Sequence, residues 1–364
     1  MHEDAHHAGG FLVHVAIGDP QAPLAKVLGV LAHHGLLAGE RLRSEVQLVS
    51  IGDHFDWGPP EQREQATSEA LALLQWLASH PPEQVILLAG NHDLARVCEL
   101  SHFADDEAYA AARREADAAY RRGQVDAAKE AAFLRRYPFV PTAETLARDL
   151  SCFSVAQREC VTALLRSCRL RLAHAHGDLL LVHAGVTVED LALLHPPFLS
   201  PPHDARAIAA SLNEFLDARV AAWDQGPLDL APLQRSGDLA FGESRGVLSH
   251  RPVDPRHAQA GALDGPPRRR FDPRRLPEGV TQVIGHVRDG KCRTEMPQWC
   301  REPGPGRDGP LRSLSISPAN GAETVSYGLG TEEQARLLFI DGGMYHVAIE
   351  AYELLDLDRV AALE

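Results

Sequence analysis

The chain has 364 residues, and 45% of them are hydrophobic, which is enough to form the core of one large domain or two smaller ones. Its 50 acidic residues outnumber its 36 basic ones, and the formal net charge is −14. This charge excludes the basic surface that general nucleic-acid binding requires, and it disfavours docking on anionic lipids. An anionic substrate would therefore need a local positive centre, which bound metal can supply.

The cysteines and the N-terminal residues favour a cytoplasmic protein. None of the six cysteines forms a Cys-x-x-Cys pair, which is typical of reduced, structural thiols. Residues 1–10 contain no apolar signal core, and no run of about 18 apolar residues predicts a membrane span. We therefore expect a cytoplasmic location and no membrane contact, whereas the oligomeric state stays open.

The first ninety residues alternate between strand-like and helix-like patterns. Short apolar runs predict strands at 11–17, 46–51 and 85–89, and helices are expected near 21–37 and 61–79. Strands that are apolar throughout are usually covered on both faces. This alternation predicts a mainly parallel sheet in an α/β fold.

A helical insertion is predicted at 94–168. Residues 104–132 are rich in Ala, Arg, Glu and Asp, and they predict one long helix or a helix pair that Pro138 and Pro141 end. A further helix is expected at 155–167. The insertion either forms a cap beside the functional site or is a solvated excursion without a role in substrate binding, and the sequence leaves both interpretations open.

The rest of the chain continues with strands, one further helix and two loops. The pattern predicts a helix around 205–223 and strands at 179–182, 281–284, 336–340 and 345–351. Residues 252–280, rich in Pro and Arg, and residues 300–312, rich in Gly and Pro, are expected to be surface loops. We interpret residues 1–364 as a single domain that carries this insertion and these loops.

Five short polar segments follow predicted strands, and each contains a side chain that can bind metal. They are Gly18–Gln21, Gly52–Asp56, Gly90–Asp93, His183–Gly185 and Gly285–His286. Residues that follow the strands of an α/β sheet gather at one edge, where such proteins place their sites. Five segments of this kind in one chain are a far more specific signal than any one of them.

These side chains have the chemistry of a two-metal hydrolase, in which oxygen and imidazole ligands surround two divalent ions that share one carboxylate. Asp53 is the natural shared ligand. The first ion would take Asp19, Gln21 and Asp53, and the second would take Asp53, Asn91, His183 and His286. With one bridging hydroxide the site would keep a net charge near +1, which suits a phosphate anion, and the ions would lower the pKa of a bound water to about 7.

Three further residues complete the predicted chemistry. His92 directly follows the ligand Asn91 and is the candidate general acid for the leaving oxygen. Asp56, three residues after Asp53, would orient or charge His92. Arg245 could bind phosphate oxygens with its two-pronged guanidinium group.

The segments resemble the calcineurin-like metallophosphoesterase superfamily, in particular its phosphoprotein-phosphatase-type branch of Ser/Thr protein phosphatases and bacterial diadenosine tetraphosphatases. Gly52–Gly58 resembles Gly-Asp-x-Val-Asp-Arg-Gly, Gly90–Asp93 resembles Gly-Asn-His-Glu/Asp, and His183–Gly185 resembles His-Gly/Ala-Gly. Gly242–Ser249 resembles the segment with the substrate-binding arginine, which maps to Arg245, and Ile340–Gly343 resembles the last strand and its turn.

This resemblance covers roughly 11–93 and 179–351. It implies a sandwich of two mixed β-sheets flanked by helices, two divalent metal ions, and hydrolysis of a phosphorylated small molecule, a nucleotide or a phosphoprotein. Val287 replaces the usual Thr after the last histidine, a change of little expected consequence.

Two further departures from the family pattern bear on metal and substrate choice. Gln21 stands where the family has His, and its harder oxygen ligand favours Mn²⁺ first, with Mg²⁺, Fe and Zn²⁺ as alternatives. Trp57 stands where the branch has a phosphate-binding Arg, which weakens the expected grip on a phosphomonoester and offers a ring for stacking. Trp57, the acidic charge of the chain and the helical insertion tilt the expected substrate toward a small molecule or nucleotide.

The same two changes motivate an alternative from another class, a non-catalytic scaffold or interaction protein that retains the fold. The presence of both His92 and Asp56 argues against this alternative, because a decayed site has little physical reason to keep its acid and the partner of that acid.

Overall fold

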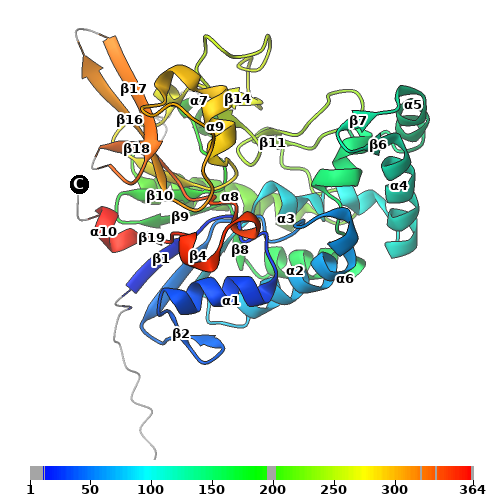
Figure 1. Ribbon diagram of the computed structural model, residues 1–364, viewed down its shortest axis with the longest axis horizontal. Coiled ribbons are helices and arrows are strands. Elements are labelled where there is room, and N and C mark those ends of the chain that lie inside the picture. Colours follow the sequence, from blue (N-terminus) through cyan, green and yellow to red (C-terminus); the bar gives the residue numbers. More distant parts are fainter. Residues whose placement is uncertain (1–10, 12, 195–201, 320–321, 333, 362–364) are drawn as a thin grey trace, which may run out of the picture.

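Two β-sheets that pack face to face form the centre of the molecule (Figure 1). The computed structural model describes residues 11, 13–194, 202–319, 322–332 and 334–361. The first sheet has the strand order β19-β1-β4-β5-β8, and the second has the order β17-β16-β18-β15-β10-β9.

The first sheet is mainly parallel. Strands β1 (Val13–Ile17), β4 (Val46–Ser50), β5 (Val85–Leu88) and β8 (Leu170–Arg171) run in one direction, and β19 (Leu355–Asp356) pairs antiparallel with β1. The connections between the parallel strands contain helices, as the alternating pattern of the first ninety residues predicts.

Helices cover the outer face of this sheet. They are α1 (Leu24–His33), α2 (Arg63–Ala78) and α6 (Val155–Arg166), which lie below the sheet in Figure 1. Successive side chains of β1 point to opposite faces, so Ile17 joins the core beneath the helices while Ala16 joins the core between the two sheets. This two-sided burial explains why the strand is mostly apolar, with His14 as its one polar residue.

The second sheet is mixed. Its parallel strands are β10 (Leu179–Val182), β15 (Thr281–Ile284) and β18 (Ala335–Phe339), and its antiparallel strands are β9 (Ala173–His176), β16 (Arg312–Ala319) and β17 (Ala322–Leu329). Helix α8 (Ala205–Ala222) packs on β9 and β10 and covers the outer face there.

Buried aliphatic side chains from both sheets form the core between them. Val49 and Leu88 of the first sheet belong to the same apolar cluster as Leu181, Val283 and Leu338 of the second. This arrangement confirms the predicted α/β sandwich of two mixed sheets flanked by helices.

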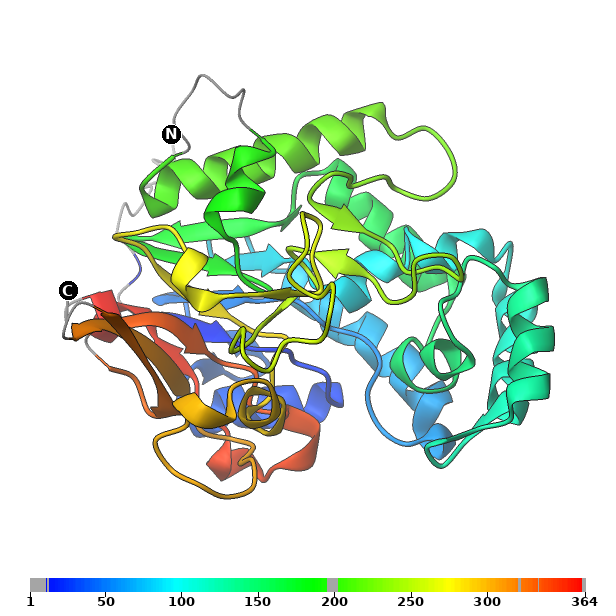
Figure 2. The same ribbon diagram turned by 90° about the horizontal axis from the view of Figure 1, so that it is seen from above.

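The segment 94–168 begins within the short helix α3 (Asn91–Ala95) and builds most of a helical lobe. Helices α4 (Asp106–Ala119) and α5 (Ala127–Arg136) form a pair, so the long-helix alternative is wrong. A hairpin of β6 (Tyr120–Arg121) and β7 (Gln124–Val125) separates them, and a single π-helical turn follows at Thr145–Asp149. The lobe extends to one side of the sandwich in Figure 2 and has an apolar core of its own.

The remaining elements are short. Three further helices are α7 (Val188–Ala192), α9 (Asp289–Glu295) and α10 (Leu357–Ala361). Three more pairs of short strands are β2 (Leu37–Ala38) with β3 (Arg41–Leu42), β11 (Gln234–Arg235) with β12 (Arg245–Gly246), and β13 (Arg251–Pro252) with β14 (Arg270–Phe271). Within the described residues, no helix is both long and apolar enough to cross a membrane.

Two predictions from the C-terminal half need correction. The strand expected at 345–351 is wrong, because two 3₁₀ turns, Met344–His346 and Ile349–Ala351, occupy that part of the chain. The segment 252–280 is more than a surface loop: β14 pairs with β13, and Phe271 is fully buried. This segment therefore contributes to the packed structure around the site.

Candidate active site

Six parallel strands, three from each sheet, end at one edge of the sandwich. The residues that follow them include Asp19, Asp53 and Asn91 from the first sheet, and His183, His286 and Asp341 from the second. Hydrogen bonds join the two sheets here: His183 Nδ1 donates to the Ile51 carbonyl at 2.9 Å, and the His286 amide donates to Asp19 Oδ2 at 2.9 Å. Donor atoms of Asp53, His183 and His286 all lie within 4.8 Å of one another.

The backbone at this edge adopts conformations that most residues avoid. The φ angles of Asp19, Asp53 and His286 are 28°, 57° and 60°. Each such residue costs about 1–3 kcal/mol and persists only where surrounding contacts enforce it. Two glycines make the crowding tolerable, because a Cβ at Gly90 would overlap the Asp53 carboxylate and one at Gly285 would overlap that of Asp19.

The centre of the site has an excess of buried negative charge. Burial, and then the neighbouring Asp341, raises the pKa of Asp19 well above its usual value. Within the described part of the chain, no lysine or arginine side chain forms an ion pair with Asp19, Asp53 or Asp341. Buried carboxylates without a lysine or arginine partner are costly, so the donor set fits a site that holds positively charged metal.

The two histidines are oriented as metal ligands usually are. His183 donates from Nδ1 to a backbone carbonyl, and its Nε2 lies 3.2 Å from Asn91 Oδ1 and 3.4 Å from Asp53 Oδ2. His286 donates from Nε2 to the Ser249 carbonyl at 3.0 Å, which leaves Nδ1 for a ligand bond. When one ring nitrogen of an imidazole binds metal, a hydrogen bond from the other nitrogen fixes the tautomer of the ring.

A backbone hydrogen bond fixes the amide group of Gln21 at the edge of the same site. Its Nε2 donates to the Phe55 carbonyl at 2.9 Å, and only the NH₂ group of an amide can make this bond. The amide oxygen is therefore left without that partner, and Gln21 lines the same cavity as Asp19 and Asp53. This orientation suits an oxygen ligand in the place of the expected histidine.

His92 and Asp56 form a hydrogen-bonded pair beside the carboxylates. The distance between His92 Nδ1 and Asp56 Oδ2 is 2.9 Å, and His92 Nε2 lies 3.9 Å from Asp53 Oδ2. Burial alone would lower the pKa of His92, but the charge of Asp53 and the hydrogen bond with Asp56 outweigh it and raise the pKa to about 9. Asp56 thus orients the imidazole, and Nε2 of the ring faces Asp53.

A buried arginine that the motifs did not single out supports this pair. Arg96 Nη1 donates to Asp56 Oδ2 at 2.6 Å and to the His92 carbonyl at 2.7 Å. The other Asp56 oxygen accepts from the Cys152 amide at 2.8 Å, so the insertion also contributes. Burial raises the pKa of Asp56, but Arg96 and His92 outweigh it and hold the pKa below its usual value.

Asp93 organises the backbone that carries the ligands. Its carboxylate accepts hydrogen bonds from the amides of Asp53, His54 and Gly90 at 2.8–3.0 Å. The His54 ring bridges Asp93 and Ser50, and it is fully buried, so its role is structural. Asp93 is the last residue of the Gly-Asn-His-Asp motif, so the sequence pointed to it, but only the folded structure shows the three backbone amides that it binds.

A cavity of about 480 Å³ opens over these side chains. Residues of the insertion form part of its wall, among them Pro141, Thr145, Arg148, Asp149 and Leu150. The insertion therefore borders the site.

The cationic wall of the cavity differs from the one expected. Arg245 does not line it, because its Nη2 donates to the Phe241 carbonyl at 3.0 Å. Arg251 and Arg269 do line it, and neither forms an ion pair with an acidic side chain in the described residues. Burial lowers the pKa of His286 well below its usual value, and the charge of the nearby Arg251 lowers this pKa further.

A second cavity of about 470 Å³ meets the first at Asp19, Gln21, Arg288 and Asp341. Its wall contains Trp57, which is almost fully buried and stacks on Tyr345 with ring centroids 5.8 Å apart. The ring of Trp57 is thus already engaged within the protein, and the two aromatic residues form one apolar wall beside the metal-capable side chains.

No family model matches the chain, and no curated protein matches it. Several solved structures match the chain. A cold-active protein tyrosine phosphatase matches 95% of this chain and 74% of its own length, at 13% identity and a TM-score of 0.45. The cold-active protein-tyrosine phosphatase of a psychrophilic Shewanella species matches 95% and 75%, at 15% identity and a TM-score of 0.44. A protein serine/threonine phosphatase from Saccharomyces cerevisiae matches 80% and 67%, at 13% identity and a TM-score of 0.35.

The chain is similar to protein phosphatases. At these identities and TM-scores the matches assign no role to any residue of this chain.

Proposed function

We propose that the chain is a metal-dependent phosphoester hydrolase. The observation that carries this proposal is the meeting of metal-capable side chains from five strand ends with a buried His–Asp pair. Neither feature alone would suffice, because buried carboxylates and buried histidines also serve structure. Together they provide a place for cations and a proton donor directed at the same space.

Two divalent ions would be held by the ligand set predicted from the sequence, with Asp53 shared between them and Gln21 as an oxygen donor. The oxygen-rich half of this set favours Mn²⁺ or Mg²⁺. When bound, the ions supply the positive charge that polarises the phosphoester and acidifies the attacking water.

The side chains of the protein then manage the leaving group. Water adds to phosphorus and the ester P–O bond breaks, so the departing oxygen needs a proton. His92 gives this proton from Nε2 and keeps its Nδ1 hydrogen bond to Asp56 throughout. Arg96 holds the Asp56 carboxylate in place and keeps it ionised, which in turn fixes the orientation of the His92 ring.

Arg251 is the proposed phosphate-binding cation, in place of Arg245. Replacing Arg251 by Ala is expected to lower kcat/KM for p-nitrophenyl phosphate about 10- to 100-fold, mostly through KM, because a hydrogen bond to a charged group is worth about 1.5–3 kcal/mol. Arg245→Ala is the matched control, and it should stay within about 3-fold of the wild type, since its guanidinium is engaged with Phe241. The opposite ranking of the two variants would return the role to Arg245.

The two cavities suggest a substrate with a phosphate and an attached ring or chain. The phosphate would lie against Arg251 and Arg269, and the aromatic wall of Trp57 and Tyr345 would take a nucleobase or a tyrosyl ring. The neighbouring phosphatases make a phosphorylated protein the other natural candidate.

Side-by-side assays test this proposal. The protein with Mn²⁺ should release phosphate from p-nitrophenyl phosphate, and it should prefer either diadenosine tetraphosphate or a phosphopeptide by a clear margin in kcat/KM. Metal-loaded protein that is inactive on all three, yet captures a stable partner, would instead support a non-catalytic interaction protein with this fold.

A further inference from the structure

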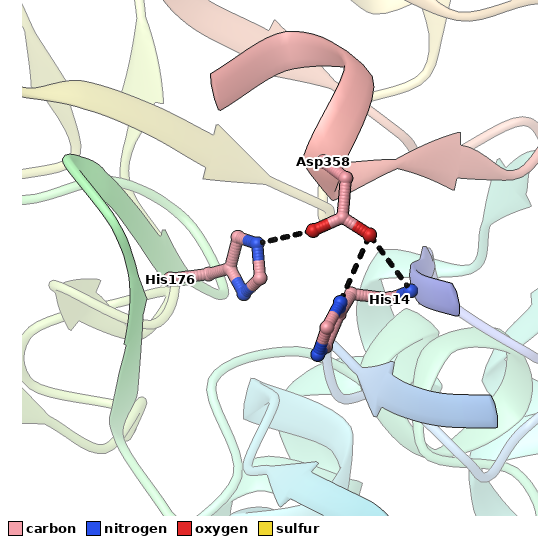
Figure 3. A group of neighbouring side chains, drawn as sticks. All are labelled: His14, His176 and Asp358. Carbon is pink, nitrogen blue, oxygen red and sulfur yellow. Dashed lines mark hydrogen bonds and ion pairs between the residues drawn. The ribbon is translucent and has the colours of Figure 1, made fainter. Parts of the chain in front are cut away.

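A second group of metal-capable side chains lies away from the candidate active site. His14 of β1, His176 of β9 and Asp358 of α10 point toward one another (Figure 3). Asp358 Oδ2 lies 2.9 Å from His14 Nδ1, and Asp358 Oδ1 lies 3.1 Å from His176 Nε2. The two imidazole rings are 4.8 Å apart between centroids.

The strand register places this group at the opposite edge of the sandwich from the active site. His14 is the second residue of β1 and pairs with Gln47 at the start of β4, whereas Asp19 and Asp53 follow the ends of these strands. His176 likewise pairs with Leu179, the first residue of β10, whereas His183 follows its last residue. The two sites therefore share no residue.

The spacing and the donor types fit one small divalent ion. Bonds of about 2.0–2.1 Å to a tetrahedral zinc ion put its donor atoms about 3.3 Å apart. His14 Nδ1 and His176 Nε2 lie at about that spacing from the two different carboxylate oxygens of Asp358, and one donor atom from each of the three residues lies within 4.8 Å of the others. Two imidazoles and one carboxylate are ligands that Zn²⁺ prefers, whereas Mg²⁺ prefers oxygen alone.

We propose that His14, His176 and Asp358 form a divalent-metal site of zinc type, with three protein ligands and one open position. The ion would join elements that have no covalent link nearby, since β1 belongs to the first sheet, β9 to the second, and α10 follows the last strand. Its effect is to fasten the C-terminal helix to both sheets. The proposal does not depend on the function of the active site.

Partial exposure makes the site accessible to an ion from solution. The side chains of His14 and His176 are 21% and 18% exposed, and that of Asp358 is 48% exposed. Removing any one of them should therefore leave the fold intact, and this permits a direct test by substitution.

The test counts bound zinc by equilibrium dialysis against limiting Zn²⁺ followed by elemental analysis. Each of His176→Ala and His14→Gln is expected to bind one ion fewer than the wild type. Zinc at about 100 times the dissociation constant should also raise the Tm of the wild type by about 3 °C more than that of either variant. Equal zinc counts in wild type and both variants would overturn the site.

Three controls keep the result specific. Asp178→Asn removes an exposed carboxylate in the turn next to His176, and it should keep the ion bound by His14, His176 and Asp358. A variant with His2, His6 and His7 changed to Asn excludes binding by the N-terminal histidines, and it should also keep that ion. Asp53→Asn disables the active site, so Co²⁺ added to it should still give the absorption of a four-coordinate ion. The same absorption in the double variant Asp53→Asn/His176→Ala would contradict the proposal.

Discussion

Replacing Asp53 by Asn is expected to lower kcat for p-nitrophenyl phosphate by at least about 1000-fold, because an amide cannot bridge two cations as a carboxylate does. The substitution keeps the shape of the side chain, and its amide oxygen can still accept from the His92 backbone amide, as Asp53 Oδ1 does at 2.9 Å. The protein should therefore fold normally, and the loss should appear in turnover. The measurement is steady-state phosphate release with saturating Mn²⁺.

Asp178→Asn provides the matched control, since it makes the same chemical change at an exposed position of the β9–β10 turn. It should keep wild-type kcat. Retention of wild-type turnover by well-folded Asp53→Asn protein would remove Asp53 from the reaction and, with it, the proposed shared ligand.

Replacing His92 by Asn should have an effect that depends on the leaving group. When a phosphoserine peptide is hydrolysed, the serine oxygen leaves as an alkoxide and needs a proton. The kcat for this substrate should therefore fall about 100- to 10,000-fold, the usual contribution of a general acid. The p-nitrophenolate ion is stable without a proton, so its release should fall about 10-fold or less. The comparison is made on one preparation with both substrates.

The contrast between the substrates separates proton donation from other roles of His92. A metal ligand or a purely structural residue would lower both rates alike, and equal losses would therefore contradict the assignment. His102→Asn replaces an exposed histidine on the neighbouring 3₁₀ turn and should leave both rates unchanged.

The strand ends could be predicted from the sequence because the information there is local. Runs such as 11–17 and 46–51 are mostly apolar, which marks strands buried on both faces, and each is followed by Gly and Asp. Parallel strands deliver such residues to one edge whatever their separation along the chain. The meeting of Asp19, Asp53 and His286 follows from that rule.

The partners that support these residues could not be predicted, because they depend on contacts between distant segments. Arg96 looks like any helix arginine in the sequence, and its bonds to Asp56 and to the Cys152 carbonyl exist only in the folded chain. The motif also favoured Arg245 over Arg251. The direction of a guanidinium is set by neighbours such as Phe241, which a linear motif does not describe.

Two strand predictions were wrong, each for a different physical reason. The hairpin of β16 and β17 was missed, although Ser313–Ser317 alternates polar and apolar residues and an Asn-Gly dipeptide separates the two strands in the sequence. The strand expected at 345–351 failed because its apolar residues pack from 3₁₀ turns, as Ile349 does beneath Gly29 of α1.

The central claim is that Asp53 holds divalent metal at the meeting edge of the two sheets. Its most direct test is the metal content of wild-type and Asp53→Asn protein, purified side by side and equilibrated with Mn²⁺. We expect the variant to contain two ions fewer per chain than the wild type, with its fold unchanged by circular dichroism. Equal metal content in the two proteins would contradict the account.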